Sequence, residues 1–236
     1  MSTLRPTPGV SPRGRVVSYI DGFNLYHGLR AAGLRRFLWL DLEKLSKSLI
    51  RNDQESARTK YFTTRIAGPE SKRKRQSTYL EALQVHCGAN VEMYWGHYQS
   101  EPRSCRACGA VEQVPSEKKT DVNIAVEMLT DAFSDRFDTA LLITADSDLV
   151  PAVCAIKKLY PSKRVVVAFP PERASAELQK HAHACFPIGR AKFSACQLPE
   201  IISKKQNGAV VELTRPEKWR EQATPFGSVL RSALNE

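Results

Sequence analysis

Residues 140–150 read A-L-L-I-T-A-D-S-D-L-V, and this stretch decides the fold that we expect for the chain. Its first four residues form an apolar run too short for a helix, which is typical of a strand buried on both faces of a parallel sheet. Asp146 and Asp148 follow directly, and Pro151 then fits only the first turn of a new helix. The stretch therefore predicts a strand, an acidic loop and a helix. Both aspartates lie beyond the carboxyl end of the strand, where open α/β sheets bind ligands.

Helix capping is the simpler role for acidic and hydroxyl side chains at such a position. Capping by Ser147 or Asp148 accounts for one of the two aspartates and leaves the other unexplained. A second acidic strand end occurs near the start of the chain, where Asp21 follows the apolar run at residues 16–20. Acidic residues therefore recur where strands end.

The clearest helical pattern spans residues 122–133, and Asp121 stands at its start. Capping is again a possible role for this acid, because a carboxylate is favourable near a helix N-terminus. We expect the apolar stripe of this helix to face the core; it consists of Val122, Ala125, Val126, Leu129 and Phe133.

Strands and helices alternate along the rest of the chain. We expect further strands at residues 57–67, 91–98 and 164–169 and helices at residues 25–32, 42–50, 72–87, 150–160 and 175–184. This alternation predicts an α/β fold with three α/β/α layers around a central, mainly parallel, Rossmann-like sheet. Because the carboxyl ends of parallel strands share one edge, the sheet brings together Asp21, Asp121, Asp146 and Asp148.

A chain of 236 residues is long enough for one well-buried domain with appendages. Residues 1–14 are rich in Pro and Gly, so we expect a flexible N-terminal segment. Residues 15–202 form the expected domain, which includes a Cys-containing excursion at residues 102–115. Residues 203–236 are polar and predict a peripheral tail, with a short helix near residues 229–234.

The formal net charge of +10 indicates a polyanionic partner, and nucleic acid ranks above a membrane surface. No apolar run approaches the ~18 residues of a spanning helix, and the N-terminus lacks the apolar core of a signal peptide. We therefore expect no membrane contact and a cytoplasmic protein. The six cysteines are dispersed, which is typical of reduced thiols.

A basic run opens the helix expected at residues 72–87; it consists of Lys72, Arg73, Lys74 and Arg75. The run fits contact with substrate phosphates, and it equally fits an ordinary solvated helix surface. Basic residues on the preceding strand favour phosphate contact slightly, because strand and helix together would form a basic wall.

Cys105 and Cys108 stand in a C-R-A-C-G turn, which is half of a zinc site. A structural zinc ion takes four ligands, and His86, Cys87 and His97 lack the usual spacing for the other two. Zinc at Cys105 and Cys108 is therefore one alternative, and a loop without metal is the other.

Four carboxylates at one edge of a sheet repel each other, so such a cluster implies a bound cation or raised pKa values. Carboxylate oxygens together with water suit Mg²⁺ or Mn²⁺. With a phosphodiester as substrate, an ion of this kind polarises the phosphate and generates or orients the attacking hydroxide.

Three blocks of the sequence, at residues 19–25, 117–123 and 143–149, read Y-I-D-G-F-N-L, E-K-K-T-D-V-N and I-T-A-D-S-D-L. They resemble, in order, the signature blocks of the NYN domain, a branch of the PIN-like ribonuclease superfamily. The resemblance implies a PIN-like fold and an Mg²⁺- or Mn²⁺-dependent ribonuclease that leaves a 3′-hydroxyl and a 5′-phosphate. An endonuclease is favoured over an exonuclease, and a homodimer is plausible by the same likeness.

Carried over by position, the metal-binding and catalytic acids are Asp21, Asp121, Asp146 and Asp148. Asn24 becomes a polar catalytic group that orients the first acid, and Lys118 and Ser147 become contacts for substrate phosphate. The chain departs from the family pattern at Ala145, where a glycine is usual, and a Cys-x-x-Cys excursion occurs in only some relatives. Neither departure removes a carboxylate.

Two other functions compete with the nuclease. A non-catalytic RNA-binding or scaffolding module would keep the fold and the basic run, but a degenerate member is expected to lack one of the acids. A phosphatase of the haloacid dehalogenase type needs D-x-D after the first strand, and this chain has Asp21-Gly22-Phe23 there.

Overall fold

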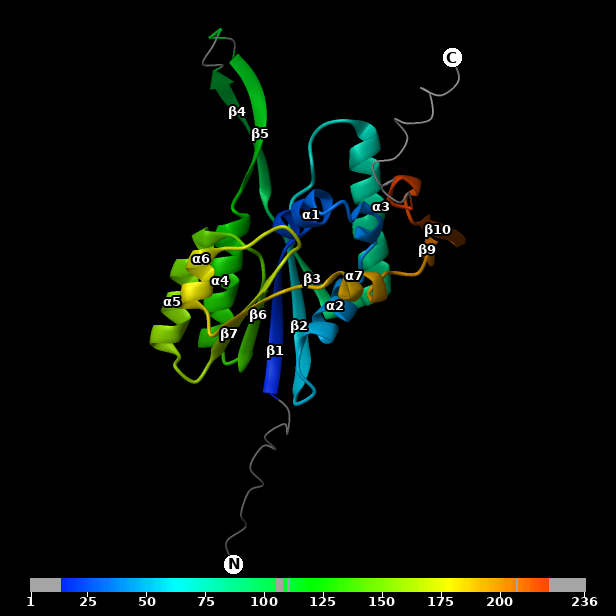
Figure 1. Ribbon diagram of the computed structural model, residues 1–236. Helices are drawn as coiled ribbons and strands as arrows, with labels where there is room; N and C mark the ends of the chain where they lie inside the picture. The colour runs from blue at the N-terminus through cyan, green and yellow to red at the C-terminus, as the bar shows by residue number, and fades with distance from the viewer. Residues whose placement is uncertain (1–13, 105–107, 110, 207, 221–236) are drawn as a thin grey trace, which may run out of the picture.

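The computed structural model describes residues 14–104, 108–109, 111–206 and 208–220, without the side chains of residues 98–104 and 111–118. Its centre is a parallel sheet of six strands in the order β3-β2-β1-β6-β7-β8 (Figure 1). The strands are β1 (Gly14–Asp21), β2 (Gln54–Thr63), β3 (Val91–Trp95), β6 (Thr139–Ile143), β7 (Arg164–Phe169) and β8 (Ala184–Pro187). The predicted α/β fold with a parallel sheet is confirmed.

Helices cover both faces of this sheet (Figure 1). One face carries α1 (Gly22–Ala31), α2 (Leu42–Leu49), α3 (Glu70–Cys87) and α7 (Arg190–Ala195), and the other carries α4 (Thr120–Phe133), α5 (Val150–Leu159) and α6 (Ala176–His181). Side chains of β6 alternate between the two sides: Leu141 and Ile143 join the first core, and Ala140 and Leu142 the second. The apolar run at residues 140–143 is therefore part of a strand buried on both faces, as predicted.

Local features of the sequence explain two of the helix starts. Asp41 caps α2, because its Oδ1 accepts a hydrogen bond from the Lys44 N–H at 2.9 Å. Pro151 lies in the first turn of α5, where its missing N–H costs no hydrogen bond.

The core face predicted for α4 is wrong at three of its five positions, although Ala125 and Leu129 are partly buried against the core. Val122, Val126 and Phe133 are 63%, 53% and 80% exposed, whereas the buried positions are Thr120, Ile124, Met128, Asp131 and Ala132. Apolar residues occur almost all round this helix, so periodicity alone does not fix which face packs. The face of α4 that packs against the sheet brings Asp131 next to Tyr19 of β1. The Tyr19 hydroxyl donates a hydrogen bond to the Asp131 carboxylate at 2.6 Å.

The middle and C-terminal parts contain elements that the sequence pattern missed. β3 ends at Trp95, and β4 (His97–Ser104) and β5 (Val111–Lys118) form an antiparallel hairpin where we expected an excursion (Figure 1). β8 and α7 were not predicted either. They are only four and six residues long, and elements of that length carry little periodicity.

The start of the expected tail packs onto the domain. β9 (Ile201–Gln206) and β10 (Ala209–Thr214) form an antiparallel hairpin, and the 3₁₀ turn η4 (Glu217–Trp219) follows. The buried Trp219 ring lies 6.5 Å from Trp39 and 5.9 Å from Tyr79, measured between centroids. The helix expected near residues 229–234 lies outside the described residues, as do residues 1–13 of the expected flexible segment.

A buried ion-pair network joins the central strands to α4. The Lys60 ammonium of β2 lies 2.6 Å from the Asp131 carboxylate and 2.7 Å from that of Glu127, and the Lys60 side chain is 8% exposed. Tyr19 donates to the same Asp131 oxygen. The network therefore fixes the rotation of α4, and with it the direction in which Asp121 points.

Replacing Lys60 by Met should lower the free energy of unfolding by about 3–5 kcal/mol, because two carboxylates then remain largely buried without their cation. Chemical denaturation measures the loss. Lys158→Met is the matched control, since Lys158 is exposed on α5. A loss below about 1 kcal/mol for Lys60→Met would show that the network contributes little.

Candidate metal centre

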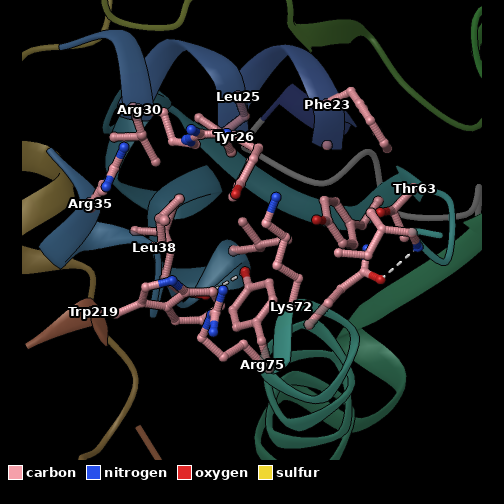
Figure 2. Close-up of a pocket in the computed structure, with 18 of the residues that line it drawn as sticks. Phe23, Leu25, Tyr26, Arg30, Arg35, Leu38, Thr63, Lys72, Arg75 and Trp219 are labelled. Carbon is pink, nitrogen blue, oxygen red and sulfur yellow. Dashed lines mark hydrogen bonds between the residues drawn. The ribbon is translucent and has the colours of Figure 1, made fainter. Parts of the chain in front are cut away.

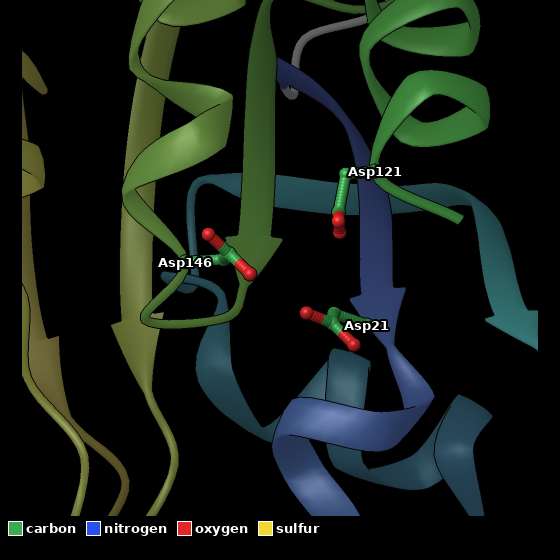
Figure 3. Close-up of side chains that lie close together, drawn as sticks. All are labelled: Asp21, Asp121 and Asp146. Carbon is green, nitrogen blue, oxygen red and sulfur yellow. The ribbon is translucent and has the colours of Figure 1, made fainter. Parts of the chain in front are cut away.

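The candidate site lies at the carboxyl ends of β1 and β6, where the strand order of the sheet reverses. β1 is flanked by β2 on one side and β6 on the other, so the loops after β1 and β6 diverge and leave a crevice at their carboxyl ends. Asp21 ends β1, Asp146 follows β6, and Asp121 enters from the first turn of α4. Ligand atoms of the three carboxylates lie within 4.8 Å of one another (Figure 3).

Asp21 is held in place from two sides. It is 3% exposed; its Oδ1 accepts a hydrogen bond from the Asn24 N–H at 2.9 Å, and its Oδ2 accepts one from the Thr144 hydroxyl at 2.8 Å. Position 22 requires glycine, because α1 starts close to β2. A Cβ atom on residue 22 would lie 2.6 Å from the Phe62 carbonyl oxygen. Residues 21–24, D-G-F-N, therefore form a tight junction between β1 and α1.

Thr144 and Asn24 shape the loop that carries Asp146. The Thr144 oxygen accepts from the Asp146 N–H at 3.1 Å, and the Asn24 side-chain oxygen accepts from the Ala145 N–H at 3.1 Å. Among the described non-glycine residues, only Lys119, Asp135 and Glu172 have positive φ, so the alanine at 145 fits this loop without backbone strain. Thr144 lies in the third sequence block, but no role was predicted for it.

Asp146, and not Ser147 or Asp148 as we expected, is the capping residue after β6. Its Oδ1 accepts a hydrogen bond from the Asp148 N–H at 3.0 Å and caps the short 3₁₀ turn η3 (Ser147–Leu149), yet its carboxylate also belongs to the cluster. Asp148 and Ser147 are exposed at the rim, and Asp148 is not one of the three clustered acids.

The Asp121 carboxyl has a raised pKa in this arrangement. Burial, followed by repulsion from Asp21, Asp146 and Asp148, raises this pKa from 3.8 to about 6. A cation placed among the three carboxylates would relieve this repulsion. Three carboxylates and space for water are the donor set of Mg²⁺ or Mn²⁺, so the residues present fit such an ion.

Two side chains that sequence reasoning missed complete the acidic cavity, which measures about 180 Å³. Arg173, from the segment after β7, and His27 of α1 both line it. Burial lowers the His27 pKa, and the positive charges of Arg173 and Arg30 lower it further. Arg173 comes from an ordinary polar loop, so no motif in the sequence marked it.

The four basic residues at the start of α3 fall into two groups. Lys72 and Arg75, one turn apart, line a second cavity beside the acidic one, while Arg73 and Lys74 are exposed and line neither cavity. The fifth predicted basic contact, Lys118, has its side chain outside the described residues.

The zinc alternative stays a prediction. Cys108 is exposed and Cys105 lies outside the described residues. Within the part of the chain that the structure describes, the three clustered aspartates form the one group with metal-like spacing.

A parallel α/β/α domain with carboxylates clustered at its central strand ends defines a PIN-like nuclease-type class. The chain matches the NYN domain family over residues 15–189 and belongs to that family, as the three sequence blocks predicted.

One relative is 6-hydroxy-3-succinoylpyridine 3-monooxygenase HspA of Pseudomonas putida (strain DSM 28022 / S16). It is 28% identical over 256 residues, which cover 92% of this chain and 78% of that protein. Among solved structures, a protein of unknown function from Vibrio parahaemolyticus, VPA0982, is 19% identical with a TM-score of 0.49. That match covers 78% of this chain and 98% of the other. In the described residues, no helix is long and apolar enough to cross a membrane.

Replacing Thr144 by Val should weaken Mn²⁺ binding about 10- to 100-fold, because Asp21 and the Asp146 loop both lose a partner while the side-chain volume is kept. Calorimetric titration of metal-free protein measures the change, with Thr130→Val, an exposed position on α4, as the control. Unchanged affinity in Thr144→Val would mean that this hydroxyl does not orient the site.

Replacing Asp121 by Asn should stabilise the metal-free protein at pH 8 by about 1–2 kcal/mol, allowing for solvent screening. The carboxyl ionises near its ordinary 3.8 in the unfolded chain and about 6 in the folded one. The folded state therefore loses stability as the pH rises from 4 to 6, and Asn removes that loss. Denaturation at pH 4 and pH 8 tests this: the gain should vanish at pH 4, and no gain at pH 8 would contradict it.

Proposed function

We propose that this protein is a metal-dependent ribonuclease that hydrolyses RNA phosphodiester bonds. The observation that carries the proposal is the convergence of Asp21, Asp121 and Asp146 from three separate elements to within 4.8 Å. Membership of the NYN family supports it, because that family is of the PIN-like ribonuclease type. The basic balance of the chain, with a net charge of +10, supports an RNA substrate.

In this proposal the three clustered aspartates hold one or more Mg²⁺ or Mn²⁺ ions. A bound divalent ion of this kind polarises a phosphodiester and supplies an oriented water for in-line attack. Asn24 and Thr144 keep the carboxylates and the loop in position through the hydrogen bonds described above. Asp148, exposed at the rim, is a further acid for a second ion or for the attacking water.

In this proposal, polar and positively charged side chains around the site bind the substrate. Arg173, which lines the acidic cavity, would contact a phosphate oxygen, and the exposed Ser147, next to Asp146 in the chain, would contact another. Lys118 is proposed for the same role from the end of β5. Endonucleolytic cleavage, a cytoplasmic location and a homodimer belong to this proposal as family or composition expectations.

Oxidation of a small heteroaromatic compound is a second candidate, because one relative is named as a 3-monooxygenase of 6-hydroxy-3-succinoylpyridine. The aromatic side chains of the cavity beside the carboxylates favour it. We rank it second because that name does not account for a cluster of three carboxylates. A non-catalytic RNA-binding module is ranked lower, since all four predicted acids are present.

Wild-type protein stripped of metal should bind Mn²⁺ and then cleave a labelled, mixed-sequence single-stranded RNA into products with 5′-phosphates. Asp146→Asn should lose metal binding and at least about a hundredfold in cleavage rate, because one clustered carboxylate is removed. Calorimetry and denaturing gels measure the two effects.

Asp53→Asn is the matched control, since Asp53 is an exposed aspartate in the turn before β2. It should behave as wild type in both assays. Cleavage that persists in Asp146→Asn, or wild-type protein that binds Mn²⁺ but leaves RNA intact, would reject the ribonuclease proposal.

A further inference from the structure

The second cavity, of about 360 Å³, lies between α1, α3 and the C-terminal turn η4 (Figure 2). Pockets that enclose a small molecule measure roughly 300–1,000 Å³, so it has room for a group the size of a nucleotide. Its walls come from parts of the chain far apart in sequence. Lys218 and Trp219 lie beyond residue 189, where the match to the NYN family ends, so the cavity is partly built outside the family domain.

The floor of the cavity is aromatic and tightly fixed. Tyr61, Tyr79 and Trp219 are each 8% exposed. The Tyr79 hydroxyl donates to the Leu40 carbonyl oxygen at 2.9 Å, and the Tyr79 and Trp219 rings meet edge to face. Such a surface is preorganised for a flat ring, because its side chains lose little freedom when a ligand stacks on them.

The rim of the cavity is cationic. Five basic side chains line it: Arg30, Arg35, Lys72, Arg75 and Lys218. The lining contains no acidic residue, and within the described part of the chain none of these five pairs with a carboxylate. Lys72 and Tyr26 extend into the hollow from opposite walls (Figure 2). The rim therefore attracts an anion that carries more than one charge.

The cavity adjoins the acidic centre. Phe23 lines both cavities, and Gly22, which also lines the larger one, directly follows Asp21. A strand held in the larger cavity would therefore lie beside the carboxylates.

We propose that this cavity binds one nucleotide of the RNA next to the bond that is cut, with its base on the aromatic floor and its phosphates on the cationic rim. The proposal rests on the ribonuclease function above and names the substrate-binding part of the same site. Stacking tolerates any base, so the cavity fixes the position of the strand and not its sequence.

Charge decides between this occupant and a small aromatic acid. A pyridine carboxylate would stack equally well on the floor, but its single negative charge would leave most of the five rim cations unmatched. Consecutive phosphates of an RNA strand supply several negative charges with the spacing of a polymer.

Binding of 5′-AMP and 5′-UMP to wild-type protein in EDTA tests the proposal without any catalytic step. Tyr26→Ala and Arg75→Gln, both at the accessible part of the cavity, should each weaken binding about tenfold or more. Phe133→Ala and Arg136→Gln are the matched controls, because both residues are exposed and line neither cavity. With metal and RNA added, the two cavity variants should raise KM with little change in kcat.

Three results would overturn the proposal: no mononucleotide binding, equal binding by wild type and the cavity variants, or binding of pyridine-3-carboxylate or inorganic phosphate as tight as that of the mononucleotides. RNA cleavage by wild type separates this failure from that of the ribonuclease proposal. Cleavage without nucleotide binding removes only the cavity's assignment, whereas nucleotide binding without cleavage removes the nuclease and leaves a nucleotide-binding cavity.

Discussion

Repulsion among Asp21, Asp121 and Asp146 is the constraint on which the structure of this site depends. Three carboxylates within 4.8 Å are unfavourable, and their repulsion adds to burial in raising the pKa of Asp121. The fold supplies the opposing forces: the hydrogen bonds to Asp21 from Thr144 and the Asn24 backbone, and the cap that Asp146 forms on η3. A site held against its own electrostatics in this way is prepared to receive a cation.

The rest of the domain keeps those carboxylates in register. Asp21 ends β1, and Asp146 lies three residues beyond the adjacent buried strand β6, so their spacing follows from sheet geometry and a short hydrogen-bonded loop. The position of Asp121 depends on the rotation of α4, which the Lys60–Asp131 ion pair between β2 and α4 fixes. The acidic centre and the aromatic cavity then share Phe23, so a single junction after β1 positions both the reacting groups and the wall of the neighbouring cavity.

Much of this was predictable from sequence because the signals are local. An apolar run followed by an acid identifies a strand end at Asp21 and Asp146, and an acid before a helical apolar pattern identifies the helix start at Asp121. Together these signals indicate one edge of the sheet for all three aspartates. The face of α4 that packs against the sheet was not predictable. A helix that is apolar on most faces is oriented by buried polar partners that lie far away in the chain. Trp219 was missed for a related reason: one aromatic residue in a polar segment carries no period, and its burial depends on Tyr79.

The central claim is that the three aspartates bind a divalent cation, and anomalous diffraction from crystals grown with Mn²⁺ tests it most directly. We predict a manganese peak within bonding distance of Asp21, Asp121 and Asp146 together, absent from crystals of Asp146→Asn. Crystals saturated with Mn²⁺ that show no peak among these carboxylates would contradict the account.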